Sequence, residues 1–358
     1  MMLFTPGPVR LPDDIRMAQA KEMITHRGKD FQELYGGLVS DIKLLMDAQE
    51  VHLMSGSGTL GIEANVSNAL AAGGKALCLS NGAFGDKLNE HCQLYYPGSK
   101  FVRLNDAKGW NLERARAHID EAAGTGAKLF CMVHHETSPG ILNKVKEICA
   151  YAKGKGMLTL LDGTSAWPAH EFSQKEFACD FYSWGSQKAL ACPPGIVCVS
   201  LSADAIKAVD AAPKRSNFMD LKAYRKMADK KETPTTPAIS VLYAMRVAID
   251  KIKMQGSIMG SVALHHDVAK MIRERVVSMD FKLVVEEGFE SNAITSFYTA
   301  KNKELGALLQ SKYNVKLGGG HADWKDTSMR FCNIGGITKE EAEIGLKALE
   351  SAKKELGI

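Results

Sequence analysis

The stretch Ser183-Trp184-Gly185-Ser186-Gln187-Lys188-Ala189-Leu190 is the part of the chain that decides the fold. It closes the apolar run 181–184 and leads, through Pro193-Pro194-Gly195, into a second strand-like run at 196–199. A lysine held at a strand end, partly out of water, is a candidate Schiff-base lysine, because desolvation lowers its pKa and leaves a neutral amine that attacks aldehydes. Taken alone, Lys188 is better interpreted as a solvated lysine on a turn, since surface lysines are common.

The strand before this lysine carries an acid at its end. The run Met157–Leu161 is continuously apolar between Gly156 and Gly163, which predicts a buried parallel strand, and Asp162 follows it directly. Proteins of the α/β class bind ligands at the carboxyl ends of such strands, and a buried carboxylate there needs a cationic partner. A protonated pyridine nitrogen is such a partner. Proteins bind pyridoxal phosphate (PLP) by pairing an aspartate with this nitrogen and a lysine with the aldehyde.

These two segments together resemble those of a known family. Asp162-Gly163-Thr164-Ser165 followed by Gly185-Ser186-Gln187-Lys188-Ala189-Leu190 is similar to the class V aminotransferases of PLP fold type I, nearest to their alanine–glyoxylate and serine–pyruvate branch. The resemblance extends over nearly the whole chain. It implies that Lys188 is the catalytic residue that holds PLP, and that Asp162 keeps the ring nitrogen protonated. It also implies that Thr164 and Gln187 contact the cofactor.

The alternation of strand-like and helical segments predicts an α/β fold with a mostly parallel sheet and right-handed crossovers. Its apolar runs lie at 51–54, 75–79, 101–104, 128–133, 157–161, 181–184 and 196–199. The resemblance implies PLP fold type I: a large domain whose seven-stranded-type sheet is sandwiched by helices, and a smaller α+β C-terminal domain. We expect an N-terminal arm at 1–15, the large PLP-binding domain at 16–255 and the small domain at 256–358.

Within the small domain, apolar runs predict four further strands. They lie at 281–285, 293–298, 315–320 and 329–335. Thr338 and Glu341 have the spacing of a capping box, which predicts the start of the last helix.

A Gly/Ser loop follows the strand at 51–54 and opens a helix predicted at 60–71. Backbone N–H groups at the positive end of a helix suit a phosphate, and side-chain hydroxyls add donors. An ordinary helix cap explains the loop equally well. With the resemblance, Ser57, Gly58 and Thr59 are interpreted as the site of the PLP phosphate, although relatives often carry histidine in place of Thr59.

Two more strand ends supply candidate cofactor contacts. Phe84 lies between glycines after the strand at 75–79, where an aromatic ring can cover a cofactor ring, and relatives often carry tryptophan there. Core packing is the alternative. The strand at 128–133 leads to Ser138, whose hydroxyl the resemblance places on the PLP ring oxygen. The neighbouring pair His134-His135 suggests metal, but nothing else completes a ligand set, so we predict no metal site.

Three residues are candidates for substrate binding. Arg330 lies in an apolar strand, where an unpaired guanidinium is costly, and bidentate pairing with a substrate α-carboxylate resolves that cost. A structural salt bridge is the alternative. The resemblance places Gly7 at the active-site mouth, although its segment also suits an arm packed across a dimer. Arg27 resembles the arginine that meets an anionic side chain in phosphoserine aminotransferases, and a structural role is slightly favoured.

The resemblance also implies a homodimer with shared active sites. Thr235 lies in a Thr-x-Pro motif that, in relatives, reaches the phosphate of the neighbouring subunit's PLP. Relatives often have a tyrosine three residues earlier as a second phosphate donor. Here that position is Glu232, whose charge opposes a phosphate.

Composition describes an ordinary soluble protein of 358 residues, with 45% hydrophobic and 24% charged residues. The net charge of +4 is weak, and no basic cluster interleaves with aromatics, so we expect no nucleic-acid partner. No apolar run is long enough to span a bilayer, and the first residues lack a secretory signal, so we expect no membrane partner. The 8 cysteines form no Cys-x-x-Cys pair, which favours buried, reduced thiols and a cytoplasmic location.

The function that follows from the resemblance is that of a PLP-dependent aminotransferase with a ping-pong mechanism. Its expected substrates are a small amino acid, such as alanine, serine or glycine, and a small 2-oxo acid such as glyoxylate or pyruvate. Phosphoserine or aspartate aminotransferase is the main alternative. A cysteine desulfurase is less favoured, because no cysteine lies between Val315 and Met329. A non-catalytic relative of the fold is the remaining alternative.

Overall fold

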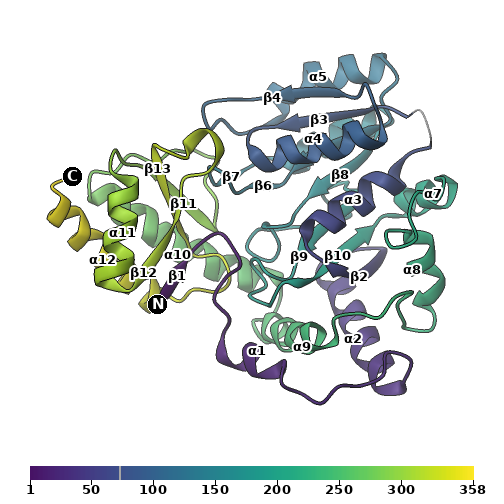
Figure 1. Cartoon of the computed structure of the whole chain (residues 1–358). Coiled ribbons are helices and arrows are strands. Elements are labelled where there is room, and N and C mark those ends of the chain that lie inside the picture. Colours follow the sequence, from purple (N-terminus) through teal and green to yellow (C-terminus); the bar gives the residue numbers. More distant parts are fainter. Residues whose placement is uncertain (72–73) are drawn as a thin grey trace.

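A seven-stranded sheet forms the centre of the larger part of the molecule (Figure 1). The computed structural model describes residues 1–71 and 74–358. In spatial order the strands are β2 (Glu50–Gly56), β10 (Gly195–Leu201), β9 (Phe181–Gly185), β8 (Leu158–Asp162), β5 (Leu129–Val133), β3 (Ala76–Ser80) and β4 (Lys100–Arg103). Only β10 runs antiparallel to its neighbours. The predicted mostly parallel sheet is therefore confirmed.

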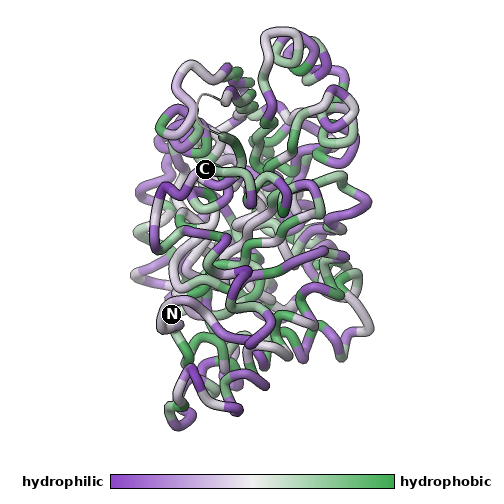
Figure 2. Tube along the Cα trace, turned by 90° about the vertical axis from the view of Figure 1, so that its right-hand side faces the viewer, coloured by the Kyte–Doolittle hydropathy of each residue, from purple (hydrophilic) through white to green (hydrophobic). Residues whose placement is uncertain are grey.

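Helices cover both faces of this sheet, because its strands are apolar on both sides. In β3, Leu77 and Leu79 pack in one core cluster and Ala76 and Cys78 in the other. The first cluster includes residues of α2 (Lys29–Leu45), α5 (Leu112–Gly124), α6 (Val145–Gly154) and α9 (Ile239–Met254). The second includes residues of α3 (Gly58–Ala69), α4 (Ala83–Tyr95), α7 (Ala203–Ala211) and α8 (Leu221–Ala228). Figure 2 shows hydrophobic and hydrophilic residues interspersed along the chain, as amphipathic helices require.

A second, four-stranded sheet lies in the smaller part of the molecule, at the left of Figure 1. Its strand order is β1 (Met2–Phe4), β12 (Val315–Gly319), β13 (Ser328–Cys332) and β11 (Ile294–Tyr298). Helices α10 (Ile258–Ser278), α11 (Asn302–Tyr313) and α12 (Lys339–Leu356) accompany it. Strand β1 pairs in parallel with β12, and Phe4 is buried against Phe331. The N-terminal arm is thus an edge strand of the small-domain sheet.

The remaining elements are short. They are α1 (Asp13–Ala18), the hairpin strands β6 (His135–Glu136) and β7 (Ile141–Leu142), and a 3-10 turn at Ala322–Trp324. The predicted capping box is present at the start of α12, where Thr338 and Glu341 bond each other's backbone.

One predicted strand, 281–285, is wrong. Only Leu283 bridges to Phe297 there. The segment divides its apolar side chains between two clusters: Phe281 packs in the small-domain core, whereas Val284 packs with Trp324 in a separate cluster. The apolar run therefore connects two clusters instead of extending the sheet.

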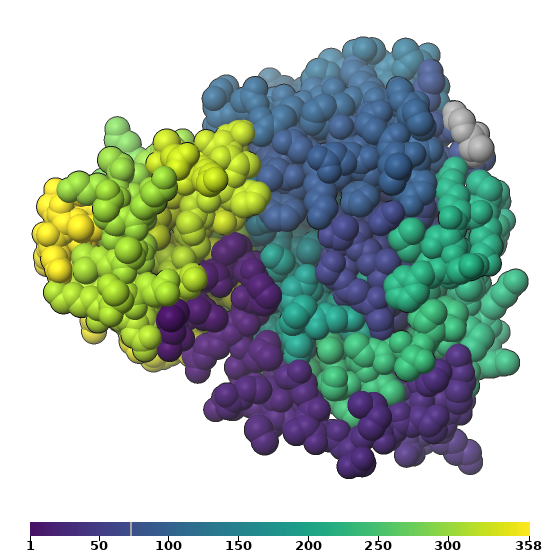
Figure 3. Space-filling view, viewed as in Figure 1, coloured from purple at the N-terminus to yellow at the C-terminus, as the bar shows by residue number. Residues whose placement is uncertain are grey.

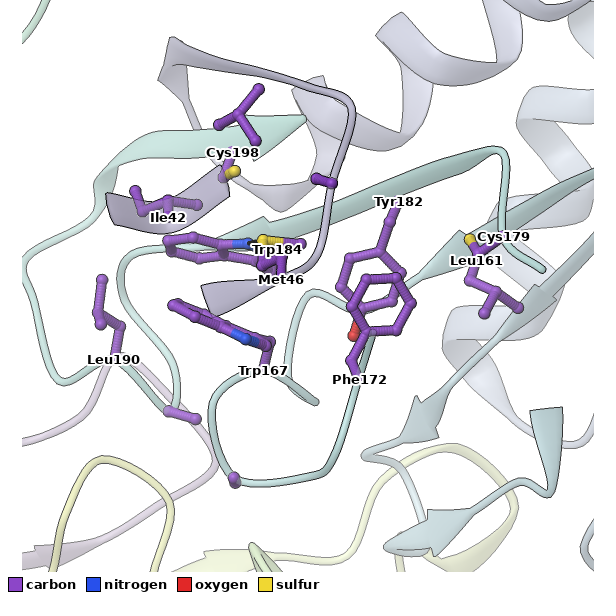
Figure 4. Close-up of a cluster of buried hydrophobic side chains, with 14 of the residues drawn as sticks. Ile42, Met46, Leu161, Trp167, Phe172, Cys179, Tyr182, Trp184, Leu190 and Cys198 are labelled. Carbon is purple, nitrogen blue, oxygen red and sulfur yellow. Dashed lines mark hydrogen bonds between the residues drawn. The ribbon is translucent and has the colours of Figure 1, made fainter. Parts of the chain in front are cut away.

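Strand β9, which leads to Lys188, is anchored by stacked aromatic rings (Figure 4). The ring of Trp184 stacks on Trp167 with centroids 4.3 Å apart, and its indole N–H donates to the Met46 sulfur at 3.2 Å. Tyr182 stacks on Phe172 at 3.7 Å. Stacked, fully buried rings hold a strand rigidly, so the loop after β9 has a fixed origin.

All eight cysteines are buried free thiols, as predicted. Within residues 1–71 and 74–358, no helix is both long and apolar enough to cross a membrane.

Candidate active site

Lys188 lies in the loop after β9 and contacts the N-terminal segment at Pro6. That segment runs between the two parts of the molecule (Figure 3). The Nζ of Lys188 donates a hydrogen bond to the Pro6 carbonyl oxygen at 2.8 Å. A Cβ on Gly7 would lie 2.8 Å from that Nζ, and the φ of Gly7, 130°, is one that residues with a side chain rarely adopt, so glycine is favoured there. Burial lowers the pKa of Lys188, and the nearby positive charge of Arg330 also lowers it. A lysine poised to lose its proton is what an amine nucleophile requires.

Asp162 ends β8, the strand next to β9, and is only 2% exposed. One carboxylate oxygen accepts a hydrogen bond from the Thr164 amide at 2.8 Å. Burial raises the pKa of Asp162, while the charge of Lys188 lowers it. Among the described residues no cation lies within salt-bridge distance of this carboxylate. A buried acid without a cationic partner suits a ligand that brings one, such as a pyridinium.

The loop before α3 has the features of a phosphate site. Helix α3 begins at Gly58, and Ser57 before it makes no side-chain capping bond. A Cβ on Gly58 would lie 2.5 Å from the Thr164 side chain, so glycine is required for this close approach. The hydroxyl oxygen of Thr164 and the Oε1 atom of Gln187 are buried without a hydrogen-bond partner. The Thr164 hydroxyl can donate a hydrogen bond to a phosphate at this uncapped helix start, whereas the Gln187 Oε1 atom can only accept one and needs a donor.

Sequence reasoning missed Lys87 in this region. Its Nζ donates to the Thr59 hydroxyl oxygen at 3.1 Å, so α4 brings a cation to the first turn of α3. The sequence around Lys87 gave no indication of this contact, because a single lysine in a helical segment is usually a solvated surface residue.

A buried glutamate that the sequence did not single out organises the strand ends around Phe84 and Ser138. Glu136 is fully buried and accepts bonds from the Phe84 amide at 3.0 Å and the Gly85 amide at 2.9 Å. It also accepts from the Ser138 amide at 3.0 Å and from the Ser138 hydroxyl at 2.6 Å. The Ser138 hydroxyl hydrogen is thus bound within the protein. Its contact with a cofactor ring oxygen stays a prediction.

Arg330, in β13, is 6% exposed and reaches toward the large domain. Its Nε donates to the Gly319 carbonyl at 2.8 Å and its Nη1 to the Thr137 carbonyl at 3.0 Å. Burial lowers its pKa. In the part of the chain that the structure describes, no carboxylate pairs with Arg330, so the structural salt bridge is not found. The guanidinium retains N–H donors for an external carboxylate.

Arg27 bonds the loop that carries Thr235. Arg27 donates from Nη1 to the Glu232 carboxylate at 2.9 Å and to the Thr233 carbonyl at 2.8 Å. The Thr233 hydroxyl in turn donates to the Thr235 carbonyl at 2.7 Å. Glu232 is therefore the partner of Arg27, and this pair braces the Thr-x-Pro loop. The proposed roles of Thr235 and Arg27 in a shared site stay predictions.

His321, also unanticipated, lies beside Phe84. Their rings are nearly parallel, at 14°, with centroids 5.9 Å apart. His134 and His135 are instead fully buried, and burial lowers their pKa values to about 3 and about 4. Across residues 1–71 and 74–358, no group of three or more His, Cys, Asp or Glu residues is placed to hold a metal ion.

Known proteins with similar sequences or folds match nearly the whole length of this chain. A serine–glyoxylate aminotransferase of Arabidopsis thaliana is 26% identical over 99% of this chain and 90% of its own length. A protein of a Synechococcus strain named as the small subunit of a soluble hydrogenase is 28% identical over 99% of this chain and 94% of its own. The crystal structure of an alanine–glyoxylate aminotransferase from a Nostoc species has a TM-score of 0.91 at 22% identity, covering 98% and 94% of the two chains.

The sequence model of the family described as aminotransferase class-V matches residues 16–338. This span includes Asp162, Lys188 and Arg330. The chain therefore belongs to the class-V aminotransferase family.

Proposed function

We propose that this protein is a PLP-dependent aminotransferase that moves the amino group of a small amino acid to a small 2-oxo acid. Alanine, serine or glycine would be the donor, and glyoxylate or pyruvate the acceptor. The observation that carries the proposal is the buried Lys188, with its lowered pKa, within electrostatic reach of the unpaired Asp162 carboxylate. The serine–glyoxylate relative supports the substrate class.

The residues of the site fit PLP. Asp162 would hold the pyridine nitrogen and Phe84 would cover the ring. The phosphate would be held by Ser57, Gly58, Thr59, Thr164 and Gln187, of which Thr164 has a buried hydroxyl that lacks a partner. Bound there, PLP supplies an electron sink for the bond at the substrate's Cα.

The chain's own residues then orient the substrate and move its protons. Arg330 binds the α-carboxylate, because its guanidinium is buried and has no protein carboxylate. Lys188 would move the proton at the substrate's Cα, a role that needs an amine with a lowered pKa. Gly7, without a side chain, leaves room beside Lys188 for the amino acid.

The alternatives lack a supporting contact. An anionic donor such as aspartate or phosphoserine would use Arg27, but within its own chain Arg27 bonds Glu232. A desulfurase needs a reactive thiol, whereas Cys332, two residues after Arg330, is buried with its pKa raised to about 12.

We further propose a cytoplasmic homodimer in which Thr235 of one subunit contacts the phosphate of the other. The eight free thiols support a reducing compartment. The bracing of the Thr235 loop by Arg27 and Glu232 supports a loop held in one conformation for that contact.

The experiment that tests the function is an absorption spectrum of the purified protein loaded with PLP, recorded before and after adding single amino acids. Alanine, serine, glycine, aspartate and phosphoserine form the panel, with Lys188→Ala as control. We expect a visible band that the small donors remove and that Lys188→Ala lacks. A protein that stays colourless with added PLP would contradict the proposal.

A further inference from the structure

His321 is presented to the active site from a fixed backbone. It lies two residues after β12, and Gly320 before it donates its N–H to the Ser328 carbonyl at 3.0 Å. The His321 carbonyl accepts a bond from the Trp324 N–H at 3.1 Å. A Cβ on Gly320 would lie 2.0 Å from the Trp324 carbonyl oxygen, so the chain is packed tightly at this turn.

The imidazole itself is held by stacking across the domain boundary. It lies nearly parallel to the Phe84 ring, with centroids 5.9 Å apart. Phe84 is fixed in turn, because its amide bonds the buried Glu136 carboxylate. A ring from the small domain and a ring from the large domain therefore form one wall of the site.

The same histidine lies close to Arg330. Arg330 is paired with Gly318 in the β12–β13 ladder, and its Nε bonds the Gly319 carbonyl, two residues before His321. The positive charge of Arg330 also acts on His321, whose pKa is lowered by burial first and by this charge second. His321 is therefore next to the group that would hold the substrate carboxylate.

His321 is exposed, and neither ring nitrogen bonds a protein group among the described residues, although stacking on Phe84 restrains the ring. A restrained imidazole with free nitrogens offers one donor and one acceptor to a ligand. The amino acid would have its amine at Lys188 and its carboxylate at Arg330. Its side chain would then extend along the wall that Phe84 and His321 form.

We propose that His321 selects the amino donor, by hydrogen bonding a β-hydroxyl and so favouring serine over alanine. This inference rests on the proposed function and names the donor within it. A neutral imidazole suits a hydroxyl, which both gives and accepts a hydrogen bond. The pKa of His321 is lowered, by partial desolvation first and by the Arg330 charge second, which favours the neutral imidazole near pH 7 although the side chain is exposed. A carboxylate side chain would instead favour a cationic partner.

The test compares serine with alanine in the half-reaction of the PLP-loaded protein, followed by loss of the visible band. His321→Ala should lower the ratio of the serine rate constant to the alanine rate constant about tenfold, the worth of one good hydrogen bond. His321→Asn, which keeps a donor and an acceptor, should recover part of the ratio. His266→Ala, an exposed histidine on α10, is the matched control and should leave the ratio at the wild-type value.

If His321→Ala lowered the rate constants for serine and alanine by the same factor, the proposal would be overturned, because this result would show that His321 only positions Phe84. A ratio in His321→Asn no higher than in His321→Ala would also overturn it. These outcomes are distinct from a failure of the proposed function, in which the wild-type band responds to neither amino acid.

Discussion

Gly7 is a residue of the site that tolerates little change. Its φ of 130° is one that residues with a side chain rarely adopt, and a Cβ would lie 2.8 Å from Lys188 Nζ and 2.9 Å from its Cδ. Two independent costs therefore act at one position. One is backbone strain, and the other is displacement of the lysine.

We predict that Gly7→Ala weakens PLP binding at least tenfold, because Lys188 is pushed from its position. Titration of the visible band with PLP measures the affinity. Gly98→Ala is the control, since Gly98 also has a positive φ, of 80°, but has no atom within 4 Å of a Cβ. It should cost stability of about 1 kcal/mol and leave PLP affinity unchanged. If Gly98→Ala lowered the PLP affinity as much as Gly7→Ala, the loss in Gly7→Ala would come from backbone strain and not from displacement of Lys188.

At the scale of elements, Glu136 joins the hairpin strand β6 to the first turn of α4. Its carboxylate accepts bonds from three backbone amides and one hydroxyl. An anion at a helix N-terminus is favourable, and its removal would leave buried amides without partners.

Glu136→Ala should therefore lower the free energy of unfolding by about 2–4 kcal/mol, measured by urea denaturation. Glu171→Ala, at an exposed position, is the control and should change it by less than about 0.5 kcal/mol. A small effect of Glu136→Ala would mean that water replaces the carboxylate and that this element contact is not structural.

The elements also show how far the sequence predicts this fold. The apolar runs predicted all seven strands of the large sheet to within a few residues, because strands covered on both faces are continuously apolar. The same signal was misleading at 281–285, where Phe281 and Val284 serve two different clusters. The pattern of apolar residues in the sequence indicates which side chains are buried, but it does not indicate in which hydrophobic cluster they are buried.

The sequence does not predict those residues of the candidate site whose contacts join distant parts of the chain. Lys188, Asp162 and Arg330 were predicted because each follows or lies in an apolar strand and because the segments around them resemble those of a known family. His321 and Lys87 were missed because their contacts are with residues distant in the sequence. His321 stacks on Phe84 and Lys87 donates a hydrogen bond to Thr59, and only the folded chain brings these pairs together. The pairing of Arg27 with Glu232 is likewise a tertiary contact that no local pattern encodes.

At the scale of the whole molecule, the proposed shared site predicts complementation between subunits. Lys188→Ala and Thr235→Asp should each be inactive as homodimers, the second because a carboxylate repels the phosphate. A heterodimer isolated through two different tags contains one intact site of two, and should show about half the wild-type activity. Thr236→Asp, an exposed neighbour, is the control and should keep its activity. An inactive heterodimer would mean that each chain forms its site alone.

The central claim is that Lys188 is the residue that carries PLP, and reductive labelling tests it most directly. The PLP-loaded protein is treated with borohydride, which fixes the cofactor to its lysine, and the peptides are analysed by mass. We predict that the added mass lies on the peptide containing Lys188 and that prior incubation with alanine or serine removes it. Labelling of another lysine, or of none, would contradict the account.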